Sequence, residues 1–206
     1  MIGVITGDII QSKKLNPAEW LNKLRQELSK IGNQPETWEI YRGDSFQVKV
    51  ANPEQALKVA FKIKAAIKSI RKGDVRMSVG IGEKNYTATR ITESNGSAFV
   101  YSGEVFEKLA KTKQNLAFAS PFTAFNREMN LLLRLALIAM DAWTVNSAEM
   151  VYLALEHPGK SQAELGEILG IRQNAVSNRL KRANFDEISD LINWYETQVA
   201  ELIKQP

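Results

Sequence analysis

Residues 172–183 are predicted to form a helix with one apolar and one polar side. Its inward positions carry Ala175, Val176, Leu180 and Ala183. Its outward positions hold seven polar residues and no acidic one: Arg172, Gln173, Asn174, Ser177, Asn178, Lys181 and Arg182. Asn, Gln and Arg side chains can form paired hydrogen bonds with adenine or guanine edges, and Lys and Arg can neutralise phosphate groups. These residue types predict a face that contacts double-stranded DNA.

A shorter helix is predicted to precede this one and to end in a sharp turn. Ser161 and Glu164 have the spacing of a capping box, which marks a helix start. Gly170 can adopt the positive φ that a sharp turn needs, and Ile171 is expected to fill the space between the helices. The inward stripe of the first helix is Leu165, Ile168 and Leu169. The two segments therefore form a candidate helix-turn-helix.

The sequence SQAELGEILGIRQNAVSNRLKRA (161–183) resembles the helix-turn-helix of sigma-factor region four and of winged-helix regulators. The similarity lies in Gly166, Gly170, Val176 and the SNRLKRA ending. Those families often begin the second helix with Ser, Thr or Pro, where this chain has Arg172. The alternative is an ordinary pair of helices that packs against another part of the protein, and the acid-free outward face disfavours it.

Two aspartates in the N-terminal part have the chemistry of a cation site. Asp8 ends an expected strand over residues 1–10, and Asp44 lies in the expected hairpin 42–45. We expect both strands to be neighbours in one sheet, so the two carboxylates should converge at one end. Carboxylate oxygens together with nucleotide phosphates suit Mg²⁺ or Mn²⁺. The alternative is turn chemistry alone, because Gly-Asp pairs are common at strand ends and hairpins.

The motifs around these aspartates resemble the catalytic core of class-three nucleotidyl cyclases and of GGDEF diguanylate cyclases. They are GDIIQS at 7–12, YRGDSF at 41–46 and VRMSVGIG at 75–82. The resemblance covers about the first 120 residues. It implies that Asp8, Asp44 and the Ile9 carbonyl hold the metal, and that Ser12 and Lys13 contact phosphate.

One part of the cyclase pattern is missing. Cyclases supply an Asn and an Arg from a late helix, whereas the corresponding segment 102–113 offers neither. This departure favours a domain that binds a nucleotide without turnover and leaves the question of an enzyme open. The opening GVITGDIIQSK, the later YRGDSFQV and the C-terminal helix-turn-helix together resemble the bacterial SatD family, over nearly the whole chain.

The order of apolar periodicities predicts an α+β protein with two domains. Strand and helix signals follow the order β-α-β-β-α-β with a central hairpin, which is typical of a ferredoxin-like domain. A short helix opening at 102–104 and a strand over 116–119 complete the domain at residues 1–121. An all-α domain with the helix-turn-helix occupies 122–206, beginning with a long helix at 124–142. The expected elements before it are a helix after Asn16, strands at 38–41, 46–50 and 75–81, and a helix after Asn52.

Composition and charge set further limits. The 206 residues include no cysteine, which excludes disulfides and thiolate metal sites. The net charge is +4, but residues 144–206 contain six basic and nine acidic residues, a net charge of −3. The N-terminus has no basic region, and its apolar run is too short for a signal peptide or a membrane span. We therefore expect a cytoplasmic protein with no membrane partner.

Three functions remain open from the residues alone. The favoured one is a DNA-binding regulator whose first domain senses a ligand, such as a nucleotide with Mg²⁺. The rivals are a nucleotidyl-transfer enzyme with a helical regulatory module, and a scaffold in which both domains bind only protein. Because one recognition helix makes few base contacts, a homodimer is expected. The apolar side of the helix 124–142, with Leu131, Leu132, Leu135, Ile138 and Ala142, offers a surface for it.

Overall fold

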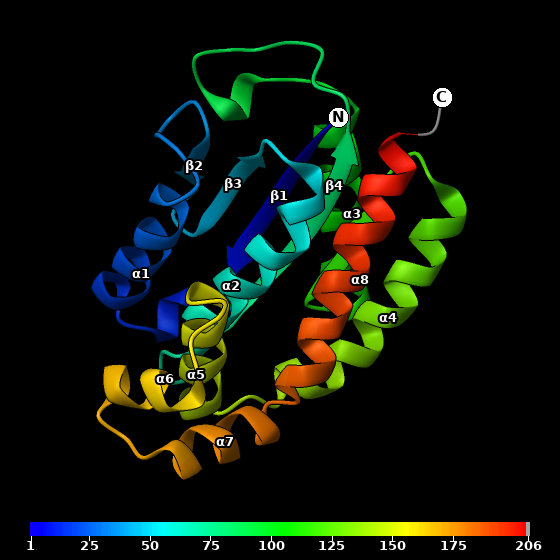
Figure 1. Cartoon of the computed structure of the whole chain (residues 1–206). Coiled ribbons are helices and arrows are strands. Elements are labelled where there is room, and N and C mark those ends of the chain that lie inside the picture. Colours follow the sequence, from blue (N-terminus) through cyan, green and yellow to red (C-terminus); the bar gives the residue numbers. More distant parts are fainter. Residues whose placement is uncertain (205–206) are drawn as a thin grey trace.

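The computed structural model describes residues 1–204 and shows an α+β protein (Figure 1). Within that range the sheet comprises β1 (Ile2–Ile9), β2 (Trp38–Tyr41), β3 (Ser45–Val50), β4 (Val75–Gly82) and β5 (Leu116–Ala119). The helices are α1 (Pro17–Ser29), α2 (Ala56–Lys68), α3 (Ser97–Thr112), α4 (Thr123–Asp141), α5 (Val145–Glu156), α6 (Gln162–Leu169), α7 (Gln173–Arg182) and α8 (Phe185–Ile203). No helix among residues 1–204 has the length and apolar character that a bilayer span requires.

The five strands form one mixed sheet in the order β2-β3-β1-β4-β5. The central strand β1 is antiparallel to both neighbours, and β5 at the edge is parallel to β4. The register places Asp8 opposite Ser45 on one side and opposite Arg76 on the other. Because side chains directly opposite each other share a face, Asp8 and Arg76 lie on the same face of the sheet.

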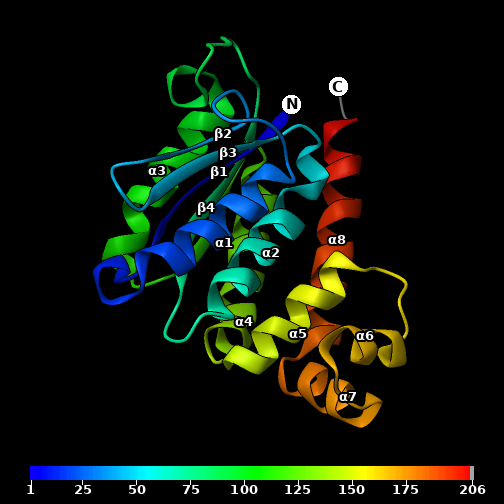
Figure 2. The same cartoon turned by 90° about the vertical axis from the view of Figure 1, so that its left-hand side faces the viewer.

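The two faces of the sheet are covered by different helices (Figure 2). Ile5 and Ile9 point into the large core that contains the buried side chains of α1 and α2. The alternate residue Val4 packs instead with Ala98 and Phe99 of α3. This is the period-two alternation that a strand buried on both faces requires.

The start of α3 differs from the prediction. The Ser-Gly-Glu motif at 102–104 was expected to open the helix, but α3 begins at Ser97. Ser102 is fully buried, and its hydroxyl donates to Thr6 Oγ1 at 2.8 Å. The helix packs so closely on β4 that a Cβ at Gly80 would lie 2.3 Å from the Ala98 carbonyl oxygen. Ser102 is therefore a small residue that fits between α3 and the sheet, and it does not cap the helix.

Two of the helices that follow β5, α4 and α8, pack against the sheet. One cluster of buried side chains includes Phe118 of β5, Phe125 of α4 and Tyr195 of α8. The Tyr195 ring stands edge-on to Phe118 with centroids 5.8 Å apart, and its buried hydroxyl donates to the Pro53 carbonyl at 2.9 Å. The chain therefore returns to its N-terminal part at α8. The division at residue 121 stays a prediction.

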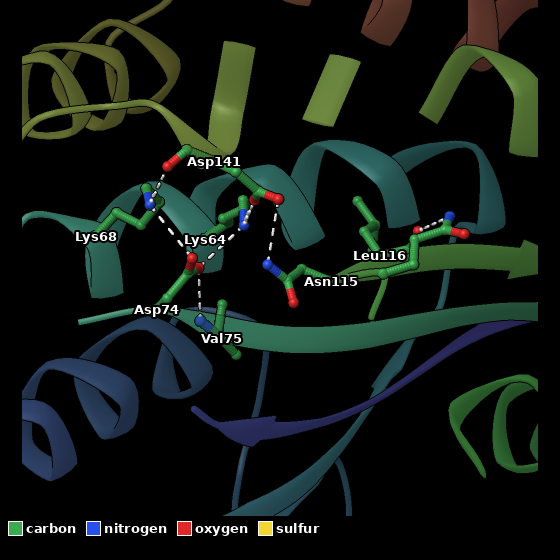
Figure 3. Close-up of polar contacts among 8 residues, drawn as sticks. Lys64, Lys68, Asp74, Val75, Asn115, Leu116 and Asp141 are labelled. Carbon is green, nitrogen blue, oxygen red and sulfur yellow. Dashed lines mark hydrogen bonds and ion pairs between the residues drawn. The ribbon is translucent and has the colours of Figure 1, made fainter. Parts of the chain in front are cut away.

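A buried lysine joins the sheet, α2 and α4 (Figure 3). Lys64 is fully buried, and its Nζ lies 3.0 Å from Asp74 Oδ1 and 2.7 Å from Asp141 Oδ1. Lys68 adds contacts with Asp74 Oδ2 at 3.3 Å and with the Asp141 carbonyl at 2.9 Å. Asn115, just before β5, donates to Asp141 Oδ2 at 3.2 Å. These contacts fix the C-terminal end of α4 against the start of β4.

Replacing this lysine should destabilise the protein strongly. We expect Lys64→Met to lower the free energy of unfolding by about 3 kcal/mol, because it removes the cation from a buried ion pair. This value is the low end of the usual range, since both carboxylates that lose their partner can reach solvent. Lys111→Met on the exposed side of α3 is the matched control and should change it by less than about 0.5 kcal/mol. Urea unfolding followed by circular dichroism measures both. Equal midpoints for the two variants would contradict the role given to Lys64.

Candidate nucleic-acid interface and ligand pocket

Helices α6 and α7 are joined by a short turn whose geometry follows from its sequence. Ser161 caps α6 in a complete capping box with Glu164. Gly170 ends α6 with φ 64°, a left-handed conformation that glycine adopts without strain. The Ile171 amide then donates to the Gly166 carbonyl at 2.9 Å. The predicted start of α6 and the predicted turn are thus present, whereas Ile168, which was expected to face inward, is 49% exposed.

The pair packs on α5 around a small core of its own. Its buried members are Met150, Leu153, Ala154, Leu165, Val176 and Leu180. Gly166 lies at the closest approach, where a Cβ would be 2.6 Å from the Ile171 carbonyl oxygen and 3.4 Å from Val176. Only glycine allows α6 and the start of α7 to approach this closely.

The outward side of α7 is exposed as predicted from its sequence. Arg172 occupies the N-cap position, and the remaining polar residues follow along the helix. The exposed set is Arg172, Gln173, Asn174, Ser177, Asn178, Lys181 and Arg182. Arg179, which the sequence left unassigned, is half-buried and forms an ion pair with Glu149 of α5 at 3.3 Å. Its charge holds α7 on α5 and is not part of the exposed face.

The supporting helix α5 is held to the body of the protein by a polar network. Lys30, directly after α1, contacts the Tyr152 hydroxyl and lies 2.9 Å from Glu156, which also pairs with Lys62 of α2. Burial and the hydrogen bond to Glu27 raise the pKa of Tyr152 to about 12. Burial opposes ionisation of Glu156, but hydrogen bonds from Lys62 and Lys30 lower its pKa overall. The lowered pKa favours the ionised form of Glu156, which pairs with Lys30 and Lys62.

A second candidate site is a cavity of about 530 Å³ at the C-terminal end of β1. Both predicted carboxylates line it, as do the two residues expected to contact phosphate. Its main polar residues are Asp8, Ser12, Lys13, Lys14, Asp44, Arg76, Lys113 and Asn115, with Ile9 beside them. The four cationic side chains outnumber the two carboxylates. The cavity therefore has the charge to attract an anion.

The contacts of the two aspartates do not fit a resident divalent cation. Both carboxylate oxygens of Asp8 are taken by Arg76, with Nε at 3.1 Å and Nη2 at 2.5 Å. Asp44 accepts a short hydrogen bond from the Ser12 hydroxyl. Among residues 1–204 no group of three or more His, Cys, Asp or Glu side chains could hold a metal ion. A cation at Asp8 would have to displace the guanidinium group.

Arg76 is the residue that sequence reasoning missed. Its guanidinium also lies over the ring of Phe106 on α3, 5.4 Å from the centroid. It was the one charged residue in an otherwise apolar or small strand, 75–82, and that was the available signal. The part of α3 that lines the cavity presents Leu109 and Ala110, and Lys113 follows it. The Asn and Arg of the cyclase pattern thus have no counterpart on this helix.

Comparison of the chain with protein-family models and with curated proteins gives no match.

The close approach at Gly166 gives a direct test of the α6–α7 geometry. Gly166→Ala should lower the free energy of unfolding by about 1–3 kcal/mol, because the added methyl group overlaps the Ile171 carbonyl. Gly103→Ala is the matched control. It lies inside α3 with nothing within 4 Å of the added Cβ, and should stabilise by about 0.5–1 kcal/mol.

Thermal unfolding by calorimetry would separate the two substitutions, since their expected effects have opposite signs. A stabilising Gly166→Ala would mean that α6 and α7 are not packed as described.

Proposed function

We propose that this protein is a DNA-binding regulator whose N-terminal part senses a phosphate-bearing ligand such as a nucleotide. The observation that carries the proposal is the exposed outward face of α7, which presents Gln, Asn, Ser, Lys and Arg and no carboxylate. In a helix-turn-helix the N-terminal half of the second helix enters the major groove. Gln173 and Asn174 lie in that half, and Lys181 and Arg182 lie where the helix would meet the DNA backbone.

Two hydrogen bonds, joined by the chain from Asp141 to Trp143, connect the cavity with the end of α7 and support the sensing role. Asn115 lines the cavity and donates to Asp141, the last residue of α4. Two residues later, the Trp143 indole donates to the carbonyl of Ala183, the C-cap of α7, at 2.9 Å. A ligand that shifts Asn115 would therefore act on the α4–α5 junction and on the end of the recognition helix.

The N-terminal part has a cyclase-like strand order, but its polar contacts favour sensing over catalysis. The antiparallel order β2-β3-β1-β4 agrees with a ferredoxin-like arrangement, and this supports the resemblance to cyclases and to the SatD family. The Asp8–Arg76 pair and the missing Asn and Arg of α3 argue against cyclase chemistry. We therefore propose a domain of cyclase-like fold that binds its ligand without turnover. The homodimer and the cytoplasmic location belong to the same proposal.

The DNA-binding role predicts two classes of variant on one helix. Gln173→Ala and Asn174→Ala should cost about 1–3 kcal/mol on the specific site and little on random DNA, because they remove base contacts. Lys181→Ala and Arg182→Ala should weaken binding to both DNAs and reduce the salt slope by about one unit per lost phosphate contact. A genomic selection followed by fluorescence anisotropy at several salt concentrations measures these effects.

The controls lie on distant helices. Asn22→Ala on α1 and Lys111→Ala on α3 remove an exposed amide and an exposed lysine, and should leave DNA binding unchanged. If selection finds no preferred sequence and the four α7 variants bind as the parent does, α6 and α7 are a packing motif only.

The ligand pocket predicts nucleotide binding without cyclisation. Calorimetry with ATP and GTP should show binding that Lys13→Ala/Lys113→Ala weakens at least about tenfold, because two phosphate-facing charges are removed. Lys111→Ala serves as the control. Repeating the titration with EDTA, Mg²⁺ and Mn²⁺ tests whether a metal takes part. Formation of a cyclic product that Asp44→Asn abolishes would establish an enzyme instead.

A further inference from the structure

Helix α4 carries two apolar stripes, and only one of them is covered. Its inner stripe is buried against the sheet and α8: Phe125, Met129, Leu133, Leu137 and Met140. Its outer stripe contains Leu131, Leu135 and Ile138, which are 50%, 56% and 74% exposed. In Figure 1 the helix lies along the right-hand edge of the molecule, next to α8. Exposed large aliphatic side chains in a row are uncommon on a monomer surface and mark an interaction site.

The outer stripe has the spacing of a coiled-coil seam. Leu131, Leu135, Ile138 and the exposed Ala142 follow one another at intervals of four, three and four residues. This is the alternating interval of the a and d positions, which keeps one seam facing a partner helix. A partner helix packed along α4 would cover all four residues.

The charges beside the seam identify the partner. Arg134 and Asp141 are seven residues apart, so they occupy the same flank of the seam. Arg134 is exposed and has no ion pair among the described residues. The Asp141 side chain is 39% exposed although it also contacts Lys64. Between Leu131 and Ala142 this flank therefore carries one positive and one negative charge, a pattern that can complement itself.

We propose that two copies of this protein associate through antiparallel α4 helices. A two-fold axis at the level of residues 136–137 places Leu135 against Ile138 of the partner subunit, and Leu131 against Ala142 of the partner subunit. The same register brings Arg134 within two residues, about 3 Å along the axis, of Asp141 of the partner subunit. A parallel pair would separate those charges by about 10 Å. The antiparallel pair is therefore the arrangement that both buries the apolar seam and brings the opposite charges beside it together.

The first experiment measures oligomeric state. Because one helix pair is smaller than the roughly 800 Å² per partner of a standard interface, we expect a dissociation constant in the micromolar range. Sedimentation of the full chain should show a dimer at about 100 µM, and Leu135→Glu should raise the dissociation constant at least about tenfold. Val100→Glu is the matched control, since Val100 is 49% exposed on α3. At concentrations well below the dissociation constant, where the parent is also monomeric, neither variant should change the thermal midpoint.

The second experiment determines orientation by disulfide formation. The chain has no cysteine, so single-cysteine variants need no background substitutions. Disulfides require Cα atoms closer than about 7 Å. Leu131→Cys and Ala142→Cys should therefore cross-link only when the two variants are mixed. Thr197→Cys on the exposed side of α8 should not cross-link with either.

Each outcome decides the proposal. Cross-linking of each variant with itself would replace the antiparallel arrangement with a parallel one. A monomer at about 100 µM without cross-links would mean that α4 does not join copies of this chain and that its face serves a different partner. Dimerisation through α4 does not depend on the DNA-binding role. A dimer that does not bind DNA would support the first proposal alone, and a monomer that binds DNA would support the second alone.

Discussion

The buried charge of Lys64 sets a constraint on which much of the structure depends. A fully buried ammonium group is tolerable only beside compensating charge, and here the carboxylates come from the loop before β4 and from the end of α4. Satisfying this one charge brings together segments that are far apart in the sequence. It fixes where α4 ends and where α5 can begin. The position of α6 and α7 follows from α5, because their small core is built on its Met150 and Leu153.

Local patterns predicted most of the elements because their signals are short-range. The hairpin at 42–45, the capping box at Ser161 and the left-handed Gly170 each depend on a few adjacent residues, and all are present. The start of α3 was wrong because Ser102 resembles a cap in sequence, while its real role is contact with Thr6, 96 residues away. The Asp8–Arg76 pair was missed for the same reason. It depends on strand register, which the spacing of residues within one segment does not contain.

The exposed face of α7 and the cavity differ in how they would attract their ligands. Residues 144–206 carry a net charge of −3, so general attraction to DNA is small and base contacts would have to supply much of the affinity. The cavity at the end of β1 has an excess of cations over carboxylates, and that favours a phosphate group at long range. Under the proposed function, the α7 face would discriminate between DNA sequences and the cavity would capture a small anion.

The return of the chain through α8 has a mechanical consequence. The segment α5–α7 is anchored at both ends: α4 enters it from the sheet, and α8 leaves it to place Tyr195 under the Pro53 carbonyl. A unit on a single tether could swing through a wide arc, whereas one clamped at two points can only slide or rotate by small amounts. Signals between the cavity and α7 would then travel as shear of packed helices rather than as hinge opening. Helix shifts of about 1–2 Å are typical of such motions.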